Sequence, residues 1–146
     1  MKLLAALDLA DATPAVLRET RAWADRLRAA VWLLHVAEPD PDFVGYEPGP
    51  DTVRDAVARK FHREHRQIED AARDLRAAGL EATALLVQGP TAATILREAE
   101  RLGADAILMG VRGHGALHDF LLGSVSRHVL HATARPVLFV PAPAAP

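Results

Sequence analysis

The stretch "DAILMGVRGHGALHDFLLGSVS", residues 105–126, joins a short apolar run to the start of a helix and holds four of the chain's nine glycines. An apolar run of this length, followed by glycine, is typical of a buried strand. The glycines at positions 110, 113 and 115 allow the backbone to adopt positive φ and to approach a bound group closely. The stretch therefore predicts a strand, a ligand-binding loop and a helix that starts near Gly123.

The rest of the chain repeats this alternation of apolar runs and helical patterns. Expected strands lie at 2–8, 31–36, 80–88, 105–110 and 136–140. Expected helices lie at 14–30, 52–78, 91–102 and 124–134. Near-continuous apolar strands separated by amphipathic helices indicate a parallel sheet with helices on both faces. Right-handed connections make this a doubly wound α/β fold, in which ligands bind outside the carboxyl ends of the strands.

Some individual residues also have expected roles in this fold. Thr13 is expected to cap the first helix, with Pro14 in its first turn. Trp23 and Trp32 have the character of packing residues. His35 lies within an expected strand, which predicts a core histidine whose hydrogen bonds are satisfied.

The composition indicates one domain and excludes several kinds of site. With 146 residues, 50% of them hydrophobic, the chain is long enough for one domain with a substantial core. We expect this domain to span residues 1–141 and a disordered Pro/Ala tail to occupy residues 142–146. The absence of cysteine excludes disulfides, thiolate catalysis and cysteine zinc sites. A formal net charge of -2 argues against a protein that binds nucleic acid through charge.

The distribution of apolar residues bears on the compartment. No apolar run approaches the roughly 18 residues that a membrane span needs. The apolar run at residues 3–7 is too short for a signal peptide, and Asp8 ends it. We therefore expect a cytoplasmic protein that does not associate with membranes.

The seven histidines do not predict a metal site. His62 and His65 are three residues apart on one expected helix, as are His128 and His131 on another. A zinc site needs three or four converging ligands, and no such cluster is visible in the sequence. We therefore assign no metal-binding residue.

The second half of the opening stretch has the features of a phosphate site. Gly123 and Ser124 stand at the start of the expected last helix, where free N–H groups and a partial charge of about +0.5 favour anions. The hydroxyls of Ser124 and Ser126 add donors. No lysine follows any glycine, which excludes a P-loop, and the dinucleotide fingerprint G-x-G-x-x-G also fails. The sequence thus predicts a phosphate cradle built mainly from backbone.

The spacing that does match is G-x2-G-x9-G-[ST], at Gly110, Gly113, Gly123 and Ser124. This spacing resembles the ATP-binding signature of the universal stress protein family. The stretch "ILMGVRGHGALHDFLLGSVSRHVLHATARPVLFV" resembles the carboxyl third of that family throughout, and the likeness covers residues 1–141.

The resemblance implies an adenine-nucleotide alpha-hydrolase-like fold with the sheet order 3-2-1-4-5. It also implies a homodimer formed through the last strand, and ATP with Mg²⁺ bound at the ends of strands one, two and four. By the same resemblance, Asp8 matches an acid near the ribose and adenine, and Val36 matches the position whose backbone meets adenine. The phosphate loop is matched by Gly110, Gly113, Gly123, Ser124, Val125 and Ser126. The family often has a serine where this chain has Ala10, so a polar contact near Asp8 is missing.

Two further residues of the loop have two open interpretations. Arg112 and His114 lie between the glycines, where either side chain could meet a phosphate oxygen. Both could equally be exposed to solvent, because loops run over the protein surface. We include both among the candidate nucleotide-binding residues.

These observations leave three functional hypotheses. The first is an ATP-binding universal stress protein with a nucleotide-dependent regulatory role. The second is a slow ATPase or an autophosphorylating protein, with Ser124 or Ser126 as the acceptor. The third is a dimeric interaction module that binds no nucleotide. Asp119 is the one carboxylate of the loop, and its place relative to the phosphates does not follow from the sequence, so we assign no catalytic residue. The sequence does not separate ATP from ADP or AMP.

Overall fold

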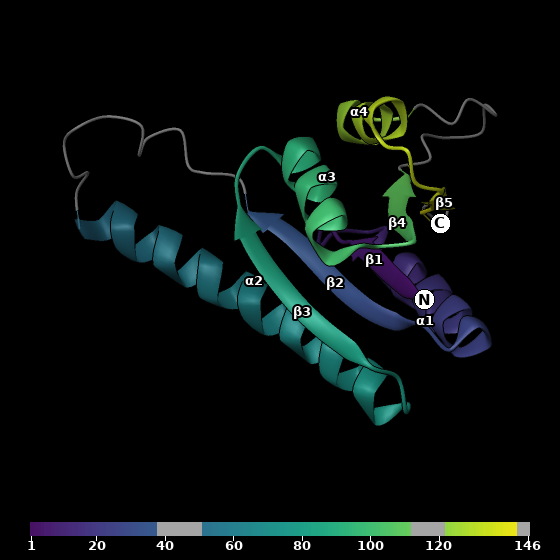
Figure 1. The fold of residues 1–146 in the computed structure, drawn as a ribbon. Coiled ribbons are helices and arrows are strands. Elements are labelled where there is room, and N and C mark those ends of the chain that lie inside the picture. Colours follow the sequence, from purple (N-terminus) through teal and green to yellow (C-terminus); the bar gives the residue numbers. More distant parts are fainter. Residues whose placement is uncertain (38–50, 112–121, 143–146) are drawn as a thin grey trace.

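The computed structural model describes residues 1–37, 51–111 and 122–142, with backbone alone at 51–54. In these ranges the strands form one parallel five-stranded sheet in the order β3-β2-β1-β4-β5 (Figure 1). The elements follow one another as β1 (Lys2–Ala6), α1 (Thr13–Leu27), β2 (Ala30–Ala37), α2 (Asp51–Ala77), β3 (Ala82–Gln88), α3 (Thr91–Leu102), β4 (Ala106–Val111), α4 (Ser124–Ala132) and β5 (Val137–Pro141). The expected doubly wound α/β fold and its strand order are confirmed.

The side-chain alternation of the strands explains why helices cover both faces of the sheet. On β1, Leu3 and Ala5 belong to a cluster with buried residues of α1 and α2, whereas Leu4 and Ala6 pack with residues of α3 and α4. Successive residues of a strand point to opposite faces. A strand that is apolar at every position is therefore buried on both sides, as this central strand is.

The position of β1 creates the switch point of the fold. β1 pairs with β2 on one side and with β4 on the other (Figure 1). The connection from β1 to β2 therefore runs to one side of β1, and the connection from β3 to β4 runs to the other side. At such a point the connections diverge and leave a crevice at the carboxyl edge of the sheet.

Two expectations about α1 are wrong. The N-cap of α1 is Ala12, and no side-chain hydrogen bond caps the helix there. The hydroxyl of Thr13 instead donates to Oδ1 of Asp8, at 3.1 Å. Trp23 is 41% exposed, because the buried side of α1 runs through Val16, Thr20 and Ala24 and leaves position 23 beside it.

The other tryptophan is a packing residue, as predicted. Trp32 lies in β2 and packs against the cluster under α3 and α4. The ammonium of Lys2 lies 5.7 Å from the centre of its ring.

The expectation of positive φ at Gly110 is also wrong, whereas its close approach to a ligand stays a prediction. Gly110 lies within β4 and not in the loop, and it is not among the described glycines with positive φ. A Cβ at this position would lie 2.6 Å from Cβ of Ala12 and 3.4 Å from Cγ2 of Val16. Glycine is therefore needed here so that the start of α1 can pack on the sheet. The predicted roles of Gly113 and Gly115 fall outside the described residues.

The predicted Pro/Ala tail is described at one position. The N–H of Ala142 donates to the carbonyl of Val111, at 2.9 Å. Residues 143–146 lie outside the described ranges, so the disordered tail stays a prediction.

Candidate functional site

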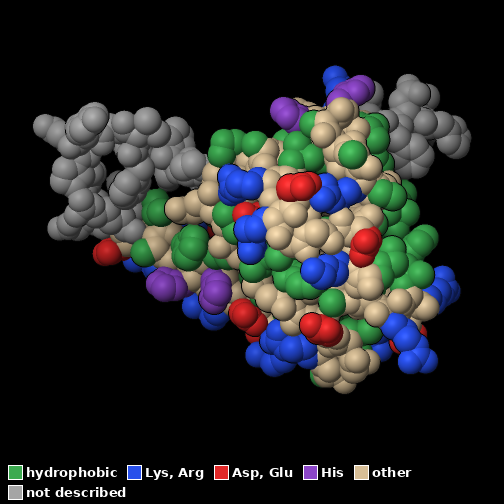
Figure 2. Space-filling view, in the orientation of Figure 1, with side chains coloured by type: hydrophobic (Ala, Val, Ile, Leu, Met, Phe, Trp, Pro, Cys, Tyr) green, Lys and Arg blue, Asp and Glu red, His purple; other side chains and the backbone are tan. Residues whose placement is uncertain are grey.

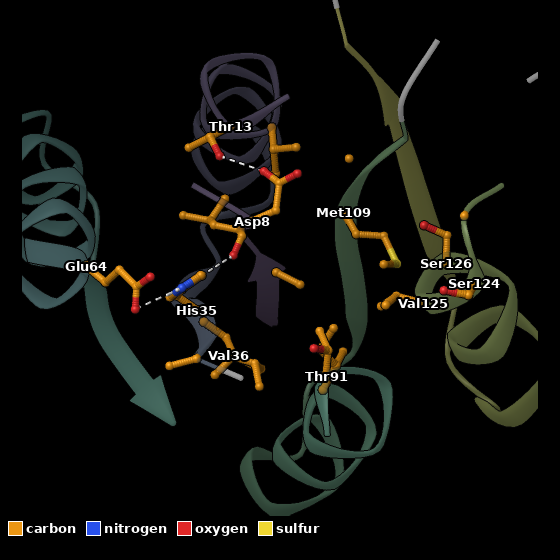
Figure 3. Close-up of a pocket in the computed structure, with 18 of the residues that line it drawn as sticks. Asp8, Thr13, His35, Val36, Glu64, Thr91, Met109, Ser124, Val125 and Ser126 are labelled. Carbon is orange, nitrogen blue, oxygen red and sulfur yellow. Dashed lines mark hydrogen bonds and ion pairs between the residues drawn. The ribbon is translucent and has the colours of Figure 1, made fainter. Parts of the chain in front are cut away.

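A cavity of about 700 Å³ opens at the carboxyl edge of the sheet. Its walls come from the ends of β1, β2 and β4, from α2, and from the first residues of α3 and α4 (Figure 3). The polar side chains that line it are those of Asp8, Thr13, His35, Lys60, Glu64, Thr91, Ser124 and Ser126. The cavity thus occupies the crevice at which ligands of doubly wound folds bind.

The structure brings together the predicted site residues that it describes. The cavity is lined by Asp8, Val36, Gly110, Gly123, Ser124, Val125 and Ser126. The other candidates, Arg112, Gly113 and His114, lie outside the described residues. Residues that are more than 100 positions apart in the chain therefore share one cavity, although their roles toward a ligand stay predictions.

Asp8 is held in place by the turn between β1 and α1. Its Oδ1 accepts hydrogen bonds from the N–H of Ala10 at 3.0 Å and from the hydroxyl of Thr13 at 3.1 Å. Leu9 adopts φ 56, a left-handed conformation that is uncommon for a residue with a side chain. Thr13 supplies a polar contact to Asp8 in a turn where Ala10 has no side-chain donor. The sequence analysis missed this contact because it assigned the threonine to the helix cap.

The start of α4 presents backbone donors to the cavity. Gly123 is the N-cap, with φ -60 and ψ 167, and no side-chain hydrogen bond caps the helix. The intrahelical ladder begins where Arg127 donates to the carbonyl of Gly123, at 3.0 Å. The first N–H groups of a helix have no intrahelical partner and carry its positive dipole end. Among the described residues, a Cβ at Gly123 would meet no atom within 4 Å, and the backbone here is extended, so its geometry does not require glycine.

On the α2 side, the cavity wall contains a contact that the sequence analysis did not predict. Nδ1 of His35 lies 2.8 Å from the carbonyl oxygen of Leu7, and Nε2 lies 3.6 Å from Oε2 of Glu64 (Figure 3). Oε1 of Glu64 lies 4.0 Å from Nζ of Lys60, one helical turn earlier. The expectation of a fully satisfied core histidine is only half right. Among the described residues, Nε2 has no hydrogen-bond partner.

The surface shows no strong bias of charge on the face in view. Lysine and arginine side chains alternate with acidic ones over this face (Figure 2). Ion pairs account for part of the pattern, as between Arg101 and Glu98 at 2.7 Å and between Arg135 and Glu100 at 2.8 Å. This face therefore does not offer the basic stripe that binding nucleic acid through charge requires.

The described residues contain neither a metal-binding cluster nor a membrane-spanning helix. They hold no group of three or more histidine, aspartate or glutamate side chains placed to bind a metal ion. No helix in these ranges has the length and apolar character to cross a membrane.

Solved structures of other proteins share this fold. Hypothetical protein MJ0577 of Methanocaldococcus jannaschii has a TM-score of 0.77 at 26% identity, and the match covers 99% of this chain and 97% of that one. A universal stress protein of Archaeoglobus fulgidus, solved in complex with dAMP, has a TM-score of 0.67 at 22% identity and covers 96% of this chain and 97% of that one. A universal stress protein solved in complex with cAMP has a TM-score of 0.65 at 20% identity, with 97% of each chain covered.

Sequence comparison gives the family. The model of the universal stress protein family matches residues 1–141. The "Universal stress protein in QAH/OAS sulfhydrylase 3'region" of Thermus aquaticus is 34% identical over 144 residues, covering 94% of this chain and 96% of that protein. The chain therefore belongs to the universal stress protein family.

Proposed function

We propose that this protein binds an adenine nucleotide, ATP with Mg²⁺, in the cavity at the carboxyl edge of the sheet, and that the bound nucleotide regulates its interactions in the stress response. The observation that carries the proposal is the shared cavity of an oriented carboxylate, Asp8, and the uncapped start of α4. A carboxylate at a strand end suits ribose hydroxyls, and a helix N-terminus suits phosphate. One cavity that offers both matches the two ends of a nucleotide.

Each part of the nucleotide would meet a different element. Asp8 would accept hydrogen bonds from ribose hydroxyls, and the backbone at Val36, at the end of β2, would meet the adenine edge. The amides of Ser124, Val125 and Ser126 would donate to phosphate oxygens, together with the serine hydroxyls. Mg²⁺ would arrive on the phosphates, because the described residues supply no metal cluster of their own. The relatives solved with dAMP and cAMP support an adenine nucleotide as the ligand class.

Arg112, Gly113 and His114 lie outside the described residues. The proposal assigns them to the phosphates on their place in the sequence alone. We assign no catalytic residue.

The proposal includes a cytoplasmic homodimer that pairs through β5. This strand is at the edge of the sheet, next to β4 alone. Its residues Val137, Leu138 and Phe139 are half-buried in the isolated chain. Edge strands with apolar residues are open to pairing with another chain. Light scattering coupled to size exclusion tests this part, with a mass of one chain as the result that overturns it.

The decisive experiment identifies the nucleotide released from the purified protein by denaturation, with Gly123→Val as the test variant. Valine fits the extended backbone at Gly123, where a Cβ would meet no described atom within 4 Å, but its side chain would fill space beside the α4 amides. Ala132→Val is the matched control, since it adds similar bulk to the exposed far end of the same helix. We expect ATP from the wild type and from the control, and none from Gly123→Val.

Two results would overturn the proposal. One is a wild type that releases no nucleotide and binds none when Mg-ATP is added. The other is a folded Gly123→Val variant that binds Mg-ATP as the wild type does, because the phosphates would then lie elsewhere.

A further inference from the structure

The His35 ring connects α2 to the end of β1. His35 lies two residues after Leu33 on β2, and so on the α1 and α2 face of the sheet. A carbonyl oxygen only accepts hydrogen bonds, so the nitrogen that lies 2.8 Å from the Leu7 carbonyl, Nδ1, must carry a proton. In a neutral imidazole the other nitrogen, Nε2, would then be an acceptor.

This tautomer conflicts with the carboxylate that faces it. Nε2 lies 3.6 Å from Oε2 of Glu64, and the two side chains are only 10% and 14% exposed. An unprotonated Nε2 and a carboxylate both offer lone pairs, and their burial makes such a contact costly. A proton on Nε2 turns the contact into an ion pair between imidazolium and carboxylate, which is stronger away from water. The geometry is therefore self-consistent when His35 is charged.

Charged and apolar groups from three elements surround the pair. On α2, Nζ of Lys60 lies 4.0 Å from Oε1 of Glu64, and the Lys60 side chain is 61% exposed. On β3, the residue in register with His35 is the apolar Leu86. From the β1 end, Asp8 lines the same cavity and adds a negative charge on that side.

The hydrogen bond from His35 holds the backbone of Leu7, the residue before Asp8. The N–H of Leu7 donates to the carbonyl of Leu34 at 2.8 Å, while its carbonyl accepts from His35. Both backbone hydrogen-bonding groups of Leu7, its N–H and the carbonyl that joins it to Asp8, are thus bonded to residues of β2. One of these residues, His35, faces Glu64 of α2 (Figure 3). Nε2 itself is buried, so the ring does not reach a ligand through that atom.

We propose that His35 and Glu64 form a buried, proton-dependent positioning pair that holds Asp8 for the nucleotide, so that nucleotide affinity falls when His35 loses its proton. This inference rests on the proposed nucleotide-binding function. His35 and Glu64 are positioning residues, because they act through the Leu7 carbonyl. With the ring neutral, repulsion between Nε2 and Glu64 loosens the contact between α2 and the end of β1.

The test compares the dissociation constant of Mg-ATP between about pH 5 and about pH 8, the interval in which histidine changes charge. Glu64→Gln is the key variant, because an amide can donate to a neutral Nε2 and so removes the need for the proton. Glu69→Gln is the matched control on the same helix, where Glu69 pairs with Arg76 at the surface. Calorimetry in buffers of different ionisation enthalpy gives the affinity and the proton uptake together.

Over this interval the dissociation constant should rise with pH in the wild type and in Glu69→Gln. We expect the factor of that rise to be about ten times the factor for Glu64→Gln, because one proton on His35 is linked to binding. Comparison between variants removes the titration of ATP itself. A wild type whose pH profile equals that of Glu64→Gln overturns the inference and leaves the proposed function intact. A wild type that binds no Mg-ATP at any pH overturns both.

A second readout needs no nucleotide. Nitrogen chemical shifts of the His35 ring distinguish an imidazolium from each neutral tautomer. We expect the imidazolium in the wild type at the acidic end of the interval and its replacement by the neutral Nδ1–H form in Glu64→Gln at the same pH. A ring that is neutral in the wild type throughout the interval overturns the inference, whatever the outcome of the binding experiment.

Discussion

Replacing Gly110 by alanine tests whether this glycine of the signature serves packing. The added Cβ would lie 2.6 Å from Cβ of Ala12, whereas carbon atoms in contact lie about 3.5–4.0 Å apart. The start of α1 must therefore move by about 1 Å, and no flexible side chain is available to absorb the shift because the partner atom is a Cβ. Overpacking of this kind costs about 1–3 kcal/mol. Alanine also restricts the unfolded chain, which returns about 0.4–1 kcal/mol.

The expected net effect is a loss of about 1–2 kcal/mol in the free energy of unfolding, in chains purified without nucleotide. For a chain of this length that corresponds to a melting temperature lower by about 2–8 °C. Gly123→Ala is the matched control, because its Cβ would meet none of the described atoms within 4 Å and its backbone is extended. Urea unfolding followed by circular dichroism measures both variants. A Gly110→Ala protein as stable as Gly123→Ala would refute the packing argument and return Gly110 to a role in ligand approach.

Three further predictions concern the core and the turn at Asp8. Leu34→Ala should lower the free energy of unfolding by about 2–5 kcal/mol, because the Leu34 side chain of β2 is fully buried beneath α3. Denaturant titration checks this, and a loss below about 1 kcal/mol contradicts it. Thr20→Val should leave the free energy of unfolding unchanged or raise it by up to about 1 kcal/mol, because the buried Thr20 hydroxyl has no hydrogen-bond partner among the described residues. A lower melting temperature would show that the hydroxyl is hydrogen-bonded. Asp8→Asn should weaken Mg-ATP binding by about tenfold or more while the melting temperature changes little, because the amide oxygen still accepts from Ala10 and Thr13. Equal affinities of variant and wild type would remove Asp8 from the site.

The fold was predictable because its signals are local. Each apolar run, such as that around Leu108, is long enough for a strand and is followed by a helical pattern. The positions of Asp8 and Ser124 at one edge then follow from the rule that parallel strands end together. Thr20 could not be placed from the sequence, because its polarity hides a position that α1 buries completely.

The contacts within the site were less predictable because they join distant positions. His35 and Glu64 are 29 positions apart in the chain, and no spacing rule relates a strand residue to a helix residue at that separation. The signal that was present is the four-residue spacing of Lys60 and Glu64, which marks one side of a helix without showing what that side faces. For Gly110, the sequence showed its place in the signature. It did not show that Ala12 and Val16, at the start of α1, leave no room for a Cβ at this position.

The length of α2 has a consequence for how the cavity opens. Its 27 residues span about 40 Å, whereas the eight residues of β2 span about 26 Å, so about the first third of the helix runs past the edge of the sheet (Figure 1). Ile68, Ala72 and Leu75, which anchor the helix to the sheet, all lie beyond that third. The turns before Glu64, which include Lys60, therefore belong to a stretch that can fray without unfolding the domain. Amide hydrogens there should exchange faster than those near Ala72. The α2 side of the cavity would then move on its own, while the strand ends that form the other walls stay in place.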